Sequence, residues 1–164
     1  GSLPGTTVSE IELSDLDNYE DPEWIQYQVN IPRMASRPAG QPNRLIFRPV
    51  IFPNQMTRSF ARLPERKHEL LIPYNLSRFR RVEISLPEGY RVVQMPDSTE
   101  LKSSFGHYRM KCIQDNSKIV FEEDVAIENE DLRIQAEEYQ DFREFCARVD
   151  RAQEQAVVLE RTGS

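Results

Sequence analysis

The chain has 164 residues, a length that fits one domain burying about 70% of its unfolded surface. Its 27 acidic and 21 basic side chains leave a net charge of -6, which argues against a general nucleic-acid-binding surface. Two cysteines permit at most one disulfide bond, no apolar run reaches the roughly 18 residues of a membrane span, and no segment has the pattern of a signal peptide.

The first feature that invites a ligand-binding interpretation is the acidic stretch DLDNYED, which contains Asp15, Asp17 and Asp21. A calcium loop of the helix-loop-helix type needs a ligand at its fifth position and a glycine at its sixth. This stretch has Tyr19 and Glu20 at those positions. We therefore expect a solvated acidic loop rather than a calcium site.

Most of the chain alternates between apolar and polar residues, which predicts half-buried strands. The clearest alternating segments are residues 25–31, 82–86, 108–112 and 119–127, the last with one polar gap at Glu123. Turn sequences at 86–90 and 115–117 join some of these segments. Short strands at this spacing favour an antiparallel β-sandwich.

Two irregular stretches interrupt the strands. Residues 33–43 contain two prolines and a glycine without periodicity, which predicts a loop. In the second stretch, Arg58, Arg62 and Arg66 recur at a spacing of four, so a helix would place them on one face, although Pro64 opposes a continuous helix. Such a face could bind an anion or an acidic partner, but surface arginines more often cover apolar area with their stems.

From about residue 136 to 154 the period becomes helical. Acidic residues precede the helix or occupy its first turns, and Arg148 and Arg151 lie near its end, as the helix dipole favours. Residues 156–159 then form a β-branched run that predicts a short final strand. The apolar side of the helix consists of Tyr139, Phe142, Phe145, Cys146, Val149 and Ala152.

The two cysteines show no sign of catalysis. A nucleophilic thiol needs its pKa lowered by a helix N-terminus or a neighbouring histidine, whereas Cys146 lies mid-helix on the apolar side. We expect a small buried hydrophobe, and a disulfide with Cys112 stays open. Together with His68 and His107, these cysteines also lack the short paired spacing of a zinc site. No catalytic constellation, phosphate loop or cofactor motif emerges, so we expect a non-catalytic module without a metal or cofactor.

Aromatic residues offer a second kind of candidate site. Exposed rings could form a sugar-stacking platform, but the alternation places most of them at core positions. Trp24 joins the three arginines as a candidate interaction residue. The aromatic residues in question are Trp24, Tyr27, Phe47, Phe52, Tyr74 and Tyr90.

Several motifs, taken in chain order, resemble one known family. It is the C-terminal domain of unknown function that follows the transglutaminase-like core in large bacterial envelope proteins. The resemblance covers roughly residues 60–161, and its most specific parts are the LPEGY turn and the EYQDFREF helix start. The motifs are RK at 66–67, LLIP at 70–73, ISLPEGY at 84–90, MP at 95–96, FGHY at 105–108, EYQDFREF at 138–145 and VVL at 157–159.

This resemblance implies an immunoglobulin-like β-sandwich beside a papain-like cysteine catalytic core, in a protein exported to the periplasm or outer membrane. No residue here matches the catalytic motifs of that core, so no catalytic role carries over. Residues 3–59 match poorly and are expected either to add strands to the sandwich or to connect it to an upstream domain. Residues 1–2 indicate a remnant of expression cloning.

Three hypotheses follow. The leading one is a non-catalytic accessory domain that packs against the upstream transglutaminase-like domain, which should leave an exposed apolar patch on this chain. The alternative is a carbohydrate- or peptide-binding module, with cell-envelope glycan or peptide as its ligand and exposed aromatic rings lining a groove. An enzymatic role would require Cys112 or Cys146 within hydrogen-bond reach of His68 or His107.

Overall fold

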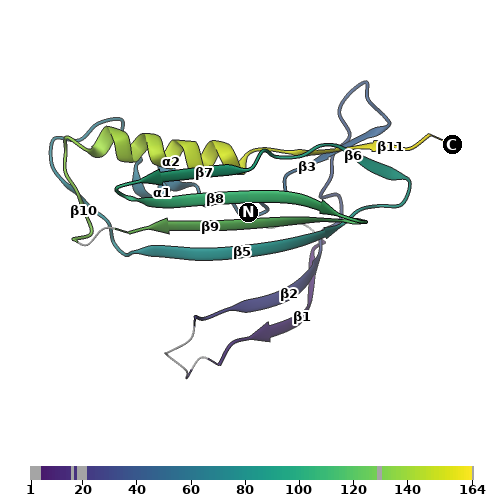
Figure 1. Cartoon of the computed structure of the whole chain (residues 1–164), viewed down its shortest axis with the longest axis horizontal. Helices are drawn as coiled ribbons and strands as arrows, with labels where there is room; N and C mark the ends of the chain where they lie inside the picture. The colour runs from purple at the N-terminus through teal and green to yellow at the C-terminus, as the bar shows by residue number, and fades with distance from the viewer. Residues whose placement is uncertain (1–4, 16, 18–21, 129–130, 164) are drawn as a thin grey trace. The chain divides into compact units, whose positions relative to one another are not determined.

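The computed structural model describes residues 5–15, 17, 22–128 and 131–163 (Figure 1). The chain divides into two compact units, residues 1–36 and residues 37–164. The N-terminal unit contains one antiparallel strand pair, β1 (Thr7–Leu13) and β2 (Ile25–Asn30). The remaining strands and both helices belong to the C-terminal unit.

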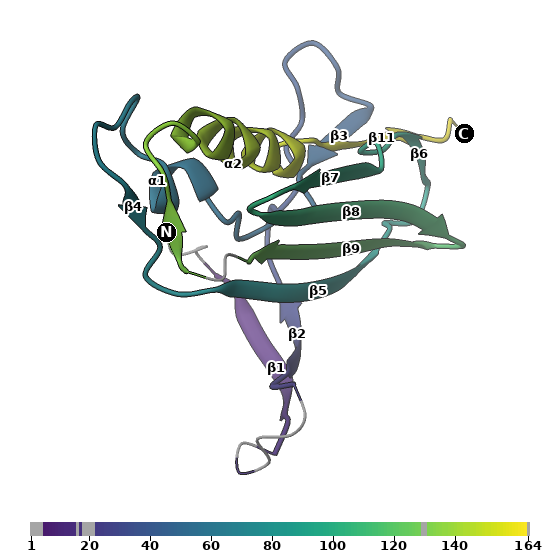
Figure 2. The same ribbon diagram turned by 60° about the vertical axis from the view of Figure 1, so that its left-hand side comes forward.

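The largest sheet of the C-terminal unit has four antiparallel strands in the order β5-β9-β8-β7. They are β5 (Leu76–Ser85), β9 (Lys118–Ile127), β8 (Gly106–Asp115) and β7 (Thr99–Ser103), and the two views show them side by side (Figures 1 and 2). The strands β8 and β9 pair along their whole length. The predicted turn at 115–117 joins β8 directly to β9, whereas the pairing of β5 with β9 is long-range.

Gly106 fixes the start of β8. Its φ of +142° is a conformation that side-chain-bearing residues rarely adopt, and a Cβ at this position would lie 2.1 Å from the backbone oxygen of Ala126. Only glycine lets β8 approach β9 this closely at the end of the sheet.

Two smaller sheets complete the C-terminal unit. One has the order β3-β11-β6, formed by β3 (Arg44–Phe47), β11 (Val157–Arg161) and β6 (Tyr90–Gln94). The other pairs β4 (Leu70–Leu71) with β10 (Arg133–Ile134). All of these pairs are antiparallel.

The two helices enclose the core. Helix α1 (Met56–Phe60) packs against α2 (Tyr139–Gln153), and α2 runs along the β7 side of the large sheet in both views (Figures 1 and 2). The rings of Phe142 and Phe105 meet edge to face at 5.4 Å between centroids. The six residues that the sequence assigns to the apolar side of the helix are all buried. Burying Phe142, Phe145 or Val149 stabilises the fold by about 1.5–3 kcal/mol each.

The predicted fold class is confirmed: the chain is mainly β, with antiparallel sheets and a C-terminal helix followed by a final strand. One expectation about burial is wrong. The alternation of residues 25–31 predicts a half-buried strand, but Ile25 and Tyr27 are exposed. The reason is that β2 pairs with β1 alone, and a two-stranded sheet has no second layer of its own to bury a face.

Candidate interaction surface

The pairing of β1 with β2 collects apolar side chains on one face. Val8 lies opposite Val29 and Leu13 lies opposite Ile25, and directly opposed residues point to the same side of a sheet. The register shifts between Ser9 and Glu12. A bulge here places two residues of β1 against one of β2, which returns the apolar residues of β1 to a single face. We call the set Val8, Ile11, Leu13, Ile25, Tyr27 and Val29 the ribbon face.

The ribbon face is open to solvent. Five of its six side chains are between 44% and 59% exposed, and the sixth, Val29, is half-buried. Trp24, 52% exposed, directly precedes Ile25, the first residue of β2. Its backbone pairs with Ser14: the Ser14 N–H donates to the Trp24 oxygen, and the Trp24 N–H donates to the Ser14 hydroxyl, both at 3.0 Å. A contiguous exposed apolar patch of this kind is a candidate interaction surface.

The three candidate arginines do not form one helical face. Arg58 lies in α1, which ends at Phe60, so Arg62 and Arg66 lie beyond the helix. The Arg58 guanidinium donates to the side-chain oxygen of Gln55 at 3.3 Å, and the Arg66 guanidinium lies 5.8 Å from the ring centroid of Tyr139. These arginines belong to the C-terminal unit, whereas Trp24 belongs to the N-terminal unit.

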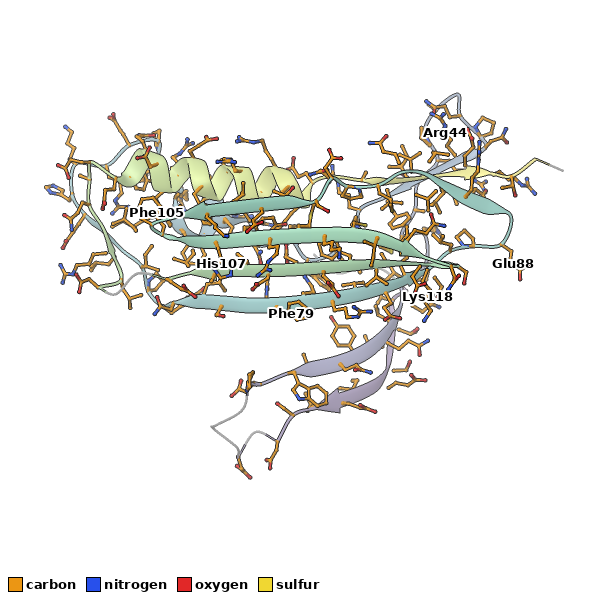
Figure 3. All side chains as sticks on the ribbon, viewed as in Figure 1. Arg44, Phe79, Glu88, Phe105, His107 and Lys118 are labelled. Atoms are coloured by element: carbon orange, nitrogen blue, oxygen red, sulfur yellow. The ribbon has the colours of Figure 1, made fainter. Side chains whose placement is uncertain are left out.

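Both cysteines are free and buried. Burial, and secondarily the charge of Asp150, raises the pKa of the Cys146 thiol to about 12, and burial also raises the pKa of Cys112. His107 and Cys112 lie on opposite faces of β8 because they are an odd number of residues apart. Figure 3 labels His107, whose imidazole lies 3.4 Å from the Asp124 carboxylate. Protonated thiols in the core lack the properties of a nucleophile.

No metal site is evident in the part of the chain that the structure describes, where no group of three or more His, Cys, Asp and Glu side chains comes together. In the acidic stretch considered for calcium, Tyr19, Glu20 and Asp21 lie outside the described residues. Within the same described part, neither helix is long and apolar enough to cross a bilayer.

The expectation that most of the selected aromatic rings lie in the core is wrong. Phe47 is buried, but Trp24, Tyr27, Phe52 and Tyr74 are exposed. The alternation of β2 could not reveal this, since the period of a strand shows that it has an apolar face and not what covers that face.

A shallow pocket of about 420 Å³ lies on β7 and β8. Its lining includes charged side chains of both signs and one aromatic residue, Tyr108, which is fully buried. The pocket therefore lacks the exposed rings of a sugar-stacking platform. The charged and imidazole side chains of its lining are Glu100, Lys102, His107, Arg109 and Glu128.

The sequence interpretation missed a buried polar network in the C-terminal unit. Glu123, 1% exposed, forms an ion pair with Arg80 of β5. It also accepts hydrogen bonds from the Tyr108 hydroxyl at 3.1 Å and from the amide of Gln153 in α2. The side-chain oxygen of Gln153 accepts the Asn54 backbone N–H at 2.8 Å. The network ties the sheet, α2 and the segment before α1 together, and its only sequence signal is the polar gap at Glu123.

A second remote contact holds α1 in place. The N-terminus of α1 lacks a side-chain cap of its own, but the Asp150 carboxylate of α2 accepts the backbone N–H groups of Met56 at 2.6 Å and Thr57 at 2.9 Å. The carboxylate thus satisfies donors that a helix start leaves unpaired. Both polar clusters serve the packing of the C-terminal unit.

Residues 43–159 match the family described as a domain of unknown function with a solved structure, DUF3858. The chain belongs to this family. The match covers the C-terminal unit from just before β3 into β11 and begins after the end of the N-terminal unit. The resemblance to a domain of unknown function is confirmed to this extent.

Among solved structures, the DUF3858 chain is similar to a protein from Parabacteroides distasonis described as a "putative protease", with a TM-score of 0.52 and 11% sequence identity. The similarity covers 60% of this chain and 19% of that protein, so the chain spans about a fifth of its neighbour's length. At this identity the likeness concerns the fold alone. No curated protein matches the chain.

Proposed function

We propose that this DUF3858 chain is a non-catalytic accessory domain of a longer bacterial protein, in which it packs against a transglutaminase-like catalytic core. The observation that carries the proposal is the ribbon face, an apolar surface that the strand pair of the N-terminal unit does not bury by itself. Interdomain faces have this property when one domain is studied without its neighbour.

The low stability of an isolated strand pair also supports packing of the ribbon face against a neighbouring domain in the longer protein. A two-stranded sheet is at best marginally stable in water unless its apolar face packs on another layer. A neighbouring domain of the same chain would supply that layer at a high effective concentration. The ribbon would then contribute to the docking surface and would itself be stabilised by it.

Three further observations agree with an accessory role. The motifs of residues 60–161 resemble a domain that follows a transglutaminase-like core. The structural neighbour is about five times longer than its matched region and is described as a "putative protease". Within the chain, Cys112 and Cys146 are buried thiols with raised pKa values, which suits packing rather than catalysis. By the same resemblance, we place the longer protein in the periplasm or at the outer membrane.

Hydrogen–deuterium exchange tests the proposal. The amides of β1 and β2 are measured in the isolated 164-residue chain and in the full-length product of its native gene. We expect their exchange to slow by about tenfold or more in the longer protein, because docking suppresses opening of the ribbon. The β8 and β9 amides serve as the control and should exchange alike in both proteins. Equal exchange of β1 and β2, or a native gene that encodes no further domain, would refute the proposal.

A further inference from the structure

From the distribution of charge we infer that the ribbon docks on a protein surface with an apolar centre and a basic rim. This inference rests on the proposed function and adds the chemistry of the partner. The ribbon face supplies the apolar half of the contact. The acidic side chains of the same unit determine which partner surfaces are favoured.

The charge of the chain is concentrated in the N-terminal unit. Residues 1–36 hold seven of the 27 acidic side chains and only one of the 21 basic ones, Arg33, so this segment has a net charge of -6. Residues 37–164 hold 20 of each and have no net charge. The whole net charge of the protein therefore belongs to the segment with the open apolar face.

The described carboxylates of the N-terminal unit have no basic partners. Within residues 5–15, 17 and 22–36, none of the acidic side chains forms an ion pair. These side chains are Glu10, Glu12, Asp15, Asp17 and Glu23, and all are exposed. Glu10 and Glu12 lie on β1, the strand that also carries Val8, Ile11 and Leu13 of the ribbon face. A segment that combines an apolar face with carboxylates that lack basic partners is complementary to an apolar surface surrounded by lysine and arginine.

A second copy of this chain fits poorly as the occupant. Pairing two ribbon faces would bring together two segments that each carry a charge of -6, and like-charge juxtaposition opposes association. A partner of opposite charge gains attraction both on approach and at the rim of the contact. The charge pattern thus favours a different, basic surface.

Two matched probes test this inference on the intact chain. They are amphipathic peptides of about five helical turns with the same leucine face, one with lysine and one with glutamate at the polar positions. Trp24 is the only tryptophan of the chain and directly precedes β2, so its fluorescence reports events at the ribbon. We expect a blue shift with the lysine peptide and an affinity about tenfold higher than for the glutamate peptide.

Salt dependence and charge variants sharpen the test. Raising the salt from about 0.05 to 0.5 M should remove most of the preference for lysine, because it screens charges at the rim. The combined Glu10→Gln, Glu12→Gln and Glu23→Gln variant should lose the preference too. As a matched control, Glu65→Gln, Glu88→Gln and Glu137→Gln neutralise three exposed carboxylates of the C-terminal unit and should retain it.

The possible outcomes separate the inference from the proposed function. Equal affinity for both peptides would overturn the inference that the partner has a basic rim, but it would not affect the packing proposal. Loss of binding to both peptides in the Ile11→Ser, Tyr27→Ser variant, with the preference intact in the parent chain, supports the inference. Binding to neither peptide, or dimerisation of the parent chain that Tyr27→Ser abolishes, would overturn it, and the exchange experiment on the longer protein would still decide the packing proposal.

Discussion

The large sheet of the C-terminal unit and the two-stranded ribbon of the N-terminal unit are built on the same pattern, yet they differ in what covers their apolar faces. In the sheet, Tyr108, Phe121 and Val125 are fully buried in the core. In the ribbon, Ile25 and Tyr27 face solvent. Alternation fixes the two faces of a strand, whereas the presence of a second layer decides whether one of them stabilises the chain.

The polar faces differ in the same way. On the outer face of the sheet, the Glu83 carboxylate lies 3.0 Å from Lys118 and 3.1 Å from Arg81, which hold its pKa below its ordinary value. Figure 3 labels Lys118 at the end of this sheet. In the ribbon, Glu12 has no ion pair among the described residues. The sheet thus pairs charges on its polar face, whereas the described carboxylates of the ribbon lack basic partners, as our proposal of a docked ribbon expects.

The largest expected effect comes from the carboxylate buried beneath the sheet. Glu123→Ala removes the partner of Arg80 and leaves the Tyr108 hydroxyl without its acceptor. We expect the free energy of unfolding to fall by about 3–5 kcal/mol, as when one member of a buried ion pair is removed. Chemical denaturation measures the change. The control is Glu122→Ala, which removes a half-buried partner of the exposed Arg81 and should cost less than about 1 kcal/mol.

If the two glutamate variants were equally stable, the network around Glu123 would contribute no more than a surface pair. The sheet would then owe its stability to apolar packing alone. Adding Arg80→Leu to Glu123→Leu distinguishes the cases, because replacing both charges removes the uncompensated guanidinium and should recover part of the loss.

The next effect concerns the close approach of β8 to β9. Gly106→Ala would place a Cβ against the Ala126 backbone oxygen at a positive φ, so we expect a loss of about 2–3 kcal/mol. Gly40→Ala is the matched control, since Gly40 also has a positive φ but no atom within 4 Å of the added carbon. It should cost only about 1 kcal/mol. Similar melting temperatures for the two variants would contradict the steric account.

Asp150 links α2 to the start of α1, and its removal should have a smaller effect. Asp150→Ala leaves the N–H groups of Met56 and Thr57 without acceptors, so we expect a loss of about 1–2 kcal/mol. Asp141→Ala, an exposed aspartate on the same helix, is the control. Amide exchange of residues 56–60 should rise in the first variant alone, and unchanged exchange there would contradict the capping role.

The raised pKa of the Cys146 thiol should make the free energy of unfolding depend on pH, with an effect similar in size to that of Asp150→Ala. Burial raises its pKa to about 12, whereas the unfolded thiol titrates near about 8.5. The corresponding stability is fully present below the unfolded pKa and decreases as the pH rises toward the folded value. Between about pH 8 and 9.5 the parent chain should lose about 1 kcal/mol more than the Cys146→Ala variant. Parallel pH profiles for the two proteins would show that the thiol has no raised pKa.

The C-terminal unit was largely predictable because burial there leaves a periodic signal. Helix α2 buries the six residues that its spacing selects, and β9 follows the alternation of residues 119–127. Strand β1 escaped prediction for a physical reason. Its bulge shifts the register after Ser9, so Val8 and Ile11 share a face although they are three residues apart, and period two disappears from the sequence.

The buried network could be predicted only in part. The polar gap at Glu123 interrupts an apolar run and indicates a buried charge that needs a partner. Its partners, however, come from β5, β8 and α2, and the nearest of them in sequence is 15 residues away. Strand register and helix docking bring them together, and neither follows from a local pattern. The candidate arginines illustrate the same limit, since Arg62 and Arg66 lie beyond the end of α1.

The smallest expected effect tests the comparison most directly. Tyr27→Ser removes an aromatic ring from the ribbon face, yet in the isolated chain it should change the free energy of unfolding by less than about 0.5 kcal/mol, because an exposed ring gains little from folding. Phe121→Ala in β9 should cost about 3–5 kcal/mol, since that ring is fully buried. A loss above about 1 kcal/mol for Tyr27→Ser would mean that the isolated chain already buries its ribbon face. The face would then need no partner, and the difference between the two regions would be one of degree.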